Sequence, residues 1–209
     1  TIDGIFKIKG EKRLLTAKYT GDAKGNSAIH NEAEKNVVLA GIKNGAASVI
    51  EVKKSERIRK APLPFTTSTL QQEAAKALNF STQKTMRIAQ QLYEGVDIEG
   101  HGTIGIITYL RTDSTRVAAE ADLSAREYIK ENYGVDYYAP MDNKKETDKK
   151  IQDAHEAIRP TDIRLTPAMV KESLQRDQFR LYQLIWKRFV ASRMQPARYE
   201  TTTAKIAVG

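Results

Sequence analysis

Two prolines in the segment Ala61-Pro62-Leu63-Pro64 divide the sequence into parts of different character. Proline lacks a backbone N–H and restricts the residue before it, so this segment is a rigid, non-helical connector. Short strand-like runs precede it, helical periodicity follows it, and strand-like sequence returns after Pro196. We therefore expect an α+β protein in which a β-rich domain is interrupted by an inserted, mainly helical domain. The expected segments are 1–65 (β-rich), 66–195 (helical) and 196–209 (return to the β-rich domain).

The β-rich domain is predicted to contain strands around one helix. The runs GIFKIKG and RLLTAKYTG, separated by a polar stretch, predict a hairpin. Asn31 followed by Glu34 resembles a helix-capping box, and Gly45 is suited to end that helix. The strand-like run ASVIEVKKSERIRK then carries five cations: Lys53, Lys54, Arg57, Arg59 and Lys60. Alternation puts several of them on one face, which suits a phosphate backbone or, equally well, a charged edge strand that resists aggregation.

Two short helices are predicted at the start of the helical domain. Ser68 is placed to cap the first and Ser81 the second, which ends near Gly95. Because little more than Asn79-Phe80 joins them, they are expected to form a compact, helix-turn-helix-like pair. Such pairs occur in DNA-binding modules, but most are scaffolding, so the pair alone leaves both roles open.

After these two helices, the sequence predicts three further elements and one loop in the helical domain. Periodicity indicates a β run at 104–109, a helix from Val117 to Tyr133, a polar loop at 138–152 and a last helix from about Asp177 to Met194. The chain begins without a methionine and ends just after a strand-like run. We interpret it as a segment of a longer protein.

Charge and residue types narrow the possible partners. The formal net charge is +8, which favours a polyanion such as nucleic acid, although a solvated basic surface is an equal alternative. The chain has no cysteine, which excludes thiolate chemistry and allows a reducing cytoplasm. Histidines at 30, 101 and 155 lack metal-ligand spacing, so no metal site is expected in the chain. No apolar run reaches the roughly 18 residues of a membrane span, so no membrane partner is expected.

The motif TYLRTDS, residues 108–114, is a candidate catalytic segment. A tyrosine phenol ordinarily has a pKa of about 10 and needs help to act as a nucleophile, whereas a guanidinium favours the phenolate and binds phosphate oxygens. On an extended chain Arg111 shares a face with Tyr109; Asp113 continues that face or caps the turn, and Thr112 begins a loop. The alternative is a strand tyrosine followed by a solvent arginine and a helix cap.

A second cluster, AHEAIRPT, contains His155 and Arg159. On a helical turn these residues lie at i and i+4 and share a face, which suits a phosphate-binding pair with a histidine able to shuttle a proton. The alternative is a capped helix end with a surface histidine. Two phosphate-suited clusters in one basic chain favour a shared explanation.

The chain resembles bacterial DNA topoisomerase I, a type IA enzyme, over about residues 64–203. The resemblance rests on these two motifs and on the segments PFTTSTLQQEA, KTMRIAQQLYEG and LYQLIWKRFVASRMQPARYETTT. The resemblance implies that Tyr109 attacks single-stranded DNA to give a 5′-phosphotyrosyl link and a free 3′-hydroxyl, so that strand passage and religation relax negative supercoils without ATP. It implies that Arg111 holds the scissile phosphate and that His155 lies near it. The supporting or DNA-binding residues would be Asp113, Thr112 and Arg159.

The resemblance also implies the surroundings of the site. The helical domain would be inserted in a β-rich arch that opens a gate, in a bacterial, nucleoid-associated protein of the cytoplasm. Magnesium would be bound by an amino-terminal acidic domain, and the chain itself has no D-x-D-x-D run. We therefore expect that domain to be a partner of this chain. We also expect the chain alone to be inactive in relaxing supercoiled DNA. The alternatives are a helix-turn-helix DNA-binding module without chemistry, a fragment of topoisomerase III or reverse gyrase, and a structural domain without a nucleic-acid role.

Overall fold

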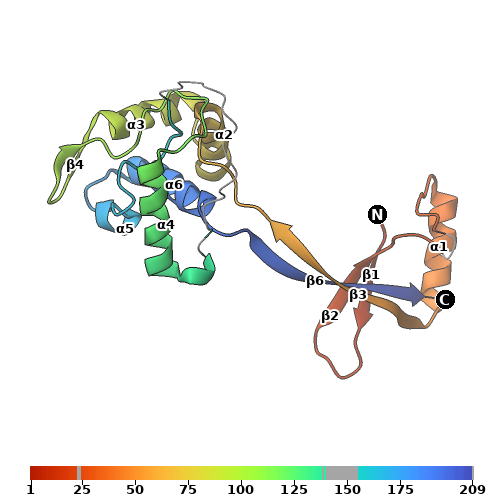
Figure 1. Cartoon of the computed structure of the whole chain (residues 1–209). Coiled ribbons are helices and arrows are strands. Elements are labelled where there is room, and N and C mark those ends of the chain that lie inside the picture. The colour runs from red at the N-terminus through yellow and green to blue at the C-terminus, as the bar shows by residue number, and fades with distance from the viewer. Residues whose placement is uncertain (23–24, 138, 140–154, 209) are drawn as a thin grey trace, which may run out of the picture. The chain divides into compact units, whose positions relative to one another are not determined.

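The structure is a computed structural model of the chain (Figure 1). It describes residues 1–22, 25–137, 139 and 155–208. The chain forms two compact units: the first consists of Thr1–Arg57 and Tyr199–Gly209, and the second of Ile58–Arg198. The chain therefore leaves the first unit after Arg57 and returns to it after Arg198.

The first unit contains the predicted hairpin and helix. Strand β1 (Asp3–Lys7) pairs antiparallel with β2 (Leu14–Lys18). Helix α1 (Glu32–Asn44) begins at the N-cap Asn31, whose side-chain oxygen accepts a hydrogen bond from the Glu34 backbone N–H at 2.9 Å. The predicted cap is confirmed, because it satisfies an N–H group that has no partner inside the helix.

A two-stranded ribbon joins the early and late parts of the chain. Strands β3 (Ala47–Arg59) and β6 (Ala197–Val208) pair with each other, and their arrows run in opposite directions in Figure 1. The hydroxyls of Ser55 and Thr201 lie 2.8 Å apart across the ribbon. The strand predicted at the end of the chain therefore has its partner within the same chain.

The second unit is mainly helical and carries one small hairpin. Its helices are α2 (Thr67–Leu78), α3 (Thr82–Glu94), α4 (Ala119–Tyr133), the 3-10 helix η1 (Val135–Tyr137), α5 (Pro167–Val170) and α6 (Arg176–Ser192). Strands β4 (Val96–Ile98) and β5 (Gly102–Ile104) form the hairpin. None of the helices in the described part of the chain is long and apolar enough to cross a membrane.

Helix α6 supplies a large part of the core of the second unit. Leu181, Ile185 and Phe189 recur at helical spacing and are at most 1% exposed. Burying each such side chain stabilises the fold by about 1.5–3 kcal/mol. The polar ends of two further buried residues are satisfied: Tyr182 Oη donates to the Leu165 carbonyl at 2.6 Å, and Trp186 Nε1 donates to the Ile163 carbonyl at 3.0 Å.

Helix α2 starts earlier than the sequence predicts. Its N-cap is Thr66, which forms a reciprocal capping box with Thr69, so the prediction of Ser68 as the cap is wrong. Threonine can serve in this position because its hydroxyl, like that of serine, accepts the backbone N–H. Ser81 caps α3, as predicted, by accepting from the Lys84 N–H at 3.2 Å.

Other predicted boundaries shift. Helix α4 begins at Ala119 rather than Val117, and α6 spans Arg176–Ser192. The strand predicted at 104–109 is wrong after Ile104, because the next residues bond to the end of α3 and to the 157–161 stretch instead of forming a ladder. The predicted loop at 138–152 lies outside the described residues except for position 139.

Candidate active site

Three separate segments of the second unit meet around the predicted catalytic residues. They are residues 65–68, the tyrosine segment (105–113) and the histidine segment (155–161). Phe65 and Ile158 form one isolated antiparallel bridge, and Ile107 and Pro160 form another. Phe65, Ile107 and Ile158 are at most 1% exposed, so buried apolar side chains fix the backbone from which the polar residues project.

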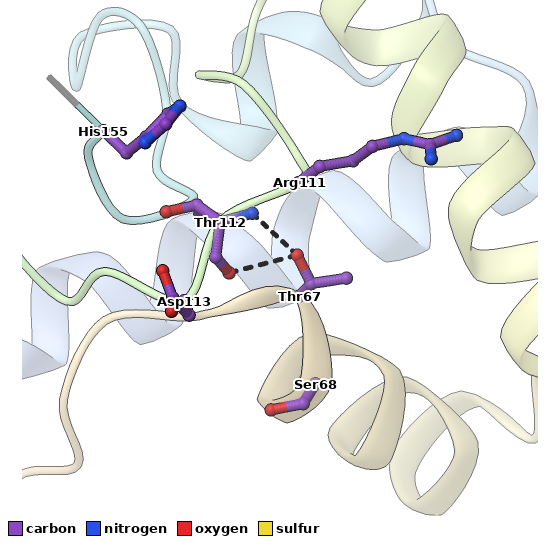
Figure 2. Close-up of a pocket in the computed structure, with 6 residues that line it drawn as sticks. All are labelled: Thr67, Ser68, Arg111, Thr112, Asp113 and His155. Carbon is purple, nitrogen blue, oxygen red and sulfur yellow. Dashed lines mark hydrogen bonds between the residues drawn. The ribbon is translucent and has the colours of Figure 1, made fainter.

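Thr67 holds the tyrosine segment to the first turn of α2. Its Oγ1 lies 2.7 Å from the Leu110 carbonyl, to which it donates, and accepts from the Thr112 N–H at 2.9 Å. Its backbone N–H donates to the Thr112 carbonyl at 2.9 Å. Figure 2 shows Thr67 facing Thr112 across this contact. Thr67 is not among the residues predicted from the sequence, although a run of hydroxyl residues at a helix start was a usable signal.

Thr108 joins the tyrosine segment to the histidine segment. Its hydroxyl donates to the Ala157 carbonyl at 2.7 Å and accepts from the Arg159 N–H at 3.0 Å. Its backbone N–H donates to the Arg159 carbonyl at 2.9 Å. These bonds bring His155 next to Tyr109, although 46 positions separate the two residues in the sequence.

Tyr109 contacts two aromatic rings. The imidazole of His155 stacks on it with centroids 6.5 Å apart and planes inclined by 26°. Tyr93 at the end of α3 meets it edge-on, a contact that was not predicted from the sequence. The phenol is 43% exposed, so a macromolecular ligand can reach it while the ring is held in place.

Gly105 allows the tyrosine segment to approach the end of α3. A Cβ atom at this position would overlap the carbonyl oxygen of Tyr93. The next residue, Ile106, donates its N–H to the Leu92 carbonyl at 2.9 Å. Glycine is therefore required here by a close backbone approach.

An open pocket of about 400 Å³ lies beside the stacked rings. It is lined by Thr67, Ser68, Arg111, Thr112, Asp113 and His155 (Figure 2). Four predicted site residues thus share one pocket. Figure 2 also shows the Arg111 side chain directed away from His155 and Asp113, so the guanidinium and the imidazole do not point at a common centre.

Arg159 has a different environment from the one predicted. The histidine segment is extended, because its backbone forms the bridges to Phe65 and Ile107 instead of a helical turn. His155 and Arg159 therefore do not share a helical face. The guanidinium pairs with Glu156 at 2.7 Å and donates to the Pro160 carbonyl at 2.9 Å. With a side chain 12% exposed, Arg159 fixes its own segment and does not line the pocket.

Hydroxyl groups, and not Asp113, cap the turn after the tyrosine segment. Thr112 Oγ1 accepts from the Ser114 N–H at 3.0 Å, and Ser114 Oγ accepts from the Arg116 N–H at 3.2 Å. Thr112 is 7% exposed, which makes it part of the scaffold. The Asp113 carboxylate is exposed on the pocket wall.

The pocket is suited to an anion and not to a metal ion. Arg111 and His155 line it, and so do Thr67 and Ser68 from the first turn of α2, where backbone N–H groups and the helix dipole favour negative charge. Asp113 contributes one carboxylate. Within the described ranges, no group of three or more histidine, cysteine, aspartate or glutamate side chains is placed to hold a metal.

Comparison with known proteins identifies the class. Residues 2–209 match the model of a family described as DNA topoisomerase, and the chain belongs to this family. Full-length topoisomerase I from Thermotoga maritima is similar in structure, with a TM-score of 0.70 and 44% sequence identity over 88% of this chain. The resemblance to bacterial topoisomerase I is thereby confirmed. The chain spans 28% of the length of the Thermotoga protein.

Proposed function

We propose that the chain is the central part of a type IA DNA topoisomerase and that Tyr109 is the nucleophile that cuts single-stranded DNA. The observation that carries this proposal is the position of Tyr109. Its ring is half-exposed and stacked on His155, which lines a pocket shared with Arg111. A held but accessible phenol beside an anion-binding pocket is what attack on a phosphodiester requires.

The proposed reaction is a reversible exchange of one phosphoester for another. The phenol loses its proton, and Tyr109 Oη bonds to phosphorus while the bond from phosphorus to the 3′ oxygen breaks. The 3′ oxygen takes up a proton, and the 5′ phosphate stays on the tyrosine. Because the phosphotyrosyl bond conserves the energy of the broken ester, religation needs no ATP. Between the two steps, another strand passes through the break, which relaxes negative supercoils.

The pocket residues would act on the phosphate. We propose that Arg111 turns towards the pocket and binds two phosphate oxygens, and that His155 donates to the same group, so that charge developing in the transition state is stabilised. Asp113 would orient Arg111. The roles of Thr112 and Arg159 would be indirect, through the turn and through the Glu156 ion pair.

Magnesium is proposed to act in the intact protein without binding this chain. The described residues offer no fitting ligand set, so no step is assigned to the metal here. An amino-terminal acidic domain of the same protein would bind the ion and be the partner of this chain, in a bacterial, nucleoid-associated enzyme of the cytoplasm. The helical unit would be an insertion in a β-rich arch.

The 209-residue chain alone should bind DNA weakly, and relaxation of plasmid by this chain with magnesium would contradict the proposal.

The test is covalent capture of DNA by the intact protein. Tyr109→Phe removes the attacking oxygen and keeps both ring contacts, so it should bind a labelled single strand normally and form no adduct on a denaturing gel. Tyr137→Phe, which alters a tyrosine 55% exposed in the same unit, should form the adduct as the wild type does. An adduct with Tyr109→Phe would reject the proposal. If the wild type also forms none, a DNA-binding module without chemistry would be favoured.

A further inference from the structure

The two faces of the β3–β6 ribbon differ in character. Side chains alternate between the faces of a strand. Ser55 meets Thr201, and Glu51 pairs with Lys205 at 2.6 Å, so these four residues lie on the same face. Both contacts belong to one antiparallel register, which also places Tyr199 opposite Arg57.

This face, the basic face, has a net positive charge. Lys53 and Arg57 alternate with Glu51 and Ser55 on it, and Lys205 already compensates Glu51. Neither Lys53 nor Arg57 has an ion-pair partner in the part of the chain that the structure describes. Both cations are exposed, and Tyr199 beside Arg57 is 48% exposed.

The opposite face has no net charge, because Glu56 and Glu200 balance Lys54 and Arg198. It carries Ile50, 64% exposed, and Val52, 57% exposed, together with Ile206. Exposed apolar surface of this kind is normally covered by other protein in the assembled molecule. The net positive charge of the ribbon therefore lies on the basic face, which makes it the face suited to a polyanion.

We propose that the basic face binds a single-stranded nucleic acid, with Lys53 and Arg57 on the phosphates and Tyr199 stacked on a base. Four residues of strand place the two cations about 13 Å apart along a straight track. Proteins that bind single strands combine such a cationic track with exposed aromatic rings. Stacking on a half-exposed ring needs an unpaired base, which selects a single strand over a duplex.

This contact would be a second one, separate from the chemistry of Tyr109. It rests on the proposed function only in requiring a nucleic-acid ligand, and it needs no covalent bond to tyrosine. The alternative explanation is that the cations protect an exposed strand against aggregation. That explanation predicts that removing the cations changes solubility and leaves DNA binding unchanged. The two explanations can therefore be separated by measuring both properties.

The experiment is anisotropy of a fluorescent oligothymidylate titrated with the 209-residue chain at several salt concentrations. The variant Lys53→Glu/Arg57→Glu should weaken binding at least tenfold and lower the slope of log K against log salt by about 1.4, since each lost phosphate contact contributes about 0.7. Tyr199→Ala should weaken binding about tenfold with an unchanged slope. Circular dichroism would verify that both variants are folded.

The matched control is Lys9→Glu/Lys12→Glu, in the exposed connection between β1 and β2 of the same unit. It makes the same change of net charge, so its effect on affinity and slope should be much smaller. Equal losses in the two double variants would overturn the proposal, and so would a ribbon variant that only aggregates. Equal competition by duplex DNA would also overturn it. The adduct test with Tyr109→Phe measures bond formation and not affinity, so the proposed function and this inference can fail separately.

Discussion

The ring of Tyr93 meets the ring of Tyr109 edge-on, with centroids 5.5 Å apart and planes at 65°. Tyr93 is the last residue but one of α3, and the close approach of Gly105 to its carbonyl fixes the distance between helix and tyrosine segment. The orientation of the proposed nucleophile therefore depends on a helix end that provides none of the residues lining the pocket.

Tyr93→Ala should lower covalent capture by the intact protein because it removes one of the two ring contacts that hold the phenol ring of Tyr109. Edge-to-face aromatic pairs contribute about 0.5–1.5 kcal/mol beyond their burial, so a loss of about tenfold in cleavage rate is expected. Binding of single-stranded DNA should not change. Tyr93→Phe keeps the ring and should restore the rate; a rate as low as that of the alanine variant would assign the effect to the hydroxyl instead.

Arg111→Ala should cut covalent capture far more than DNA binding. A donor that stabilises transition-state charge is typically worth about 10²–10³ in rate, whereas one phosphate contact among several changes affinity little. Single-turnover cleavage and equilibrium binding measure the two effects in the intact protein. Arg116→Ala, at an exposed position in the following turn, is the control. If both quantities fall equally, Arg111 is an ordinary phosphate contact.

Thr67→Val should destabilise the second unit by about 1–3 kcal/mol, because the Leu110 carbonyl and the Thr112 N–H lose their hydroxyl partner. Urea unfolding followed by fluorescence of Trp186, the one tryptophan of the chain, reports on this unit. Thr67→Ser keeps the hydroxyl and should retain most of the stability. A serine variant as unstable as the valine variant would show that the methyl group, and not the hydrogen bonds, is responsible.

Much of the fold is predictable because its signals are local. The hairpin at β1–β2 and the caps Asn31 and Ser81 depend on residues a few positions apart, and all three are confirmed. The change from strands to helices after Pro62-Leu63-Pro64 agrees with the start of α2. Local hydrogen bonds and chain stiffness determine these elements, and both can be recognised in a short stretch of sequence.

The site was less predictable because its geometry depends on contacts between distant segments. His155 and Arg159 have helical spacing, but pairing with Ile107 and Phe65 keeps their segment extended. Tyr109 follows an apolar run that suggests a strand, yet Gly105 diverts the chain onto the end of α3. The motifs identified which residues gather at the pocket, but not the turns and aromatic contacts that hold them.

Gly105→Ala should destabilise the second unit by about 1–3 kcal/mol, since the new methyl group would overlap the Tyr93 carbonyl and force the backbone apart. Trp186 fluorescence in urea measures the loss. Gly41→Ala is a control in which the free energy of unfolding should change in the opposite direction. Gly41 lies inside α1 with open space around it, so alanine should stabilise the first unit by about 0.5–1 kcal/mol. Circular dichroism measures this gain. An unchanged midpoint for Gly105→Ala would show that the segment moves without cost.

Asp122 should make stability depend on acidic pH. Its carboxylate lies 2.6 Å from both Arg126 and Arg193, and it is 8% exposed. Burial raises the pKa of Asp122, but the hydrogen bonds and charges of the two arginines outweigh it and hold the pKa below the usual 3.8. The stabilisation is therefore complete above the unfolded pKa and is lost as pH falls through the lower folded pKa.

The corresponding variant is Asp122→Asn. At pH 7 it should unfold with about 3 kcal/mol less free energy than the wild type, because two part-buried arginines lose their counter-charge. The difference should shrink below about pH 4. Glu127→Gln, exposed on the same helix, should differ from the wild type by less than about 0.5 kcal/mol at any pH. A gap for Asp122→Asn that stays constant into acid would contradict the assignment.

The ribbon has a consequence for the order of folding. Ser55 and Thr201 bond to each other although 146 positions separate them, so the first unit is built from the two ends of the chain. Closing an unstructured loop of that length carries a large entropic cost, whereas a second unit that is already folded shortens the loop before β6 pairs with β3. Residues 1–57 therefore precede the second unit in the sequence but belong to the unit that is completed after it, and slow folding of the second unit would delay the pairing of β3 with β6.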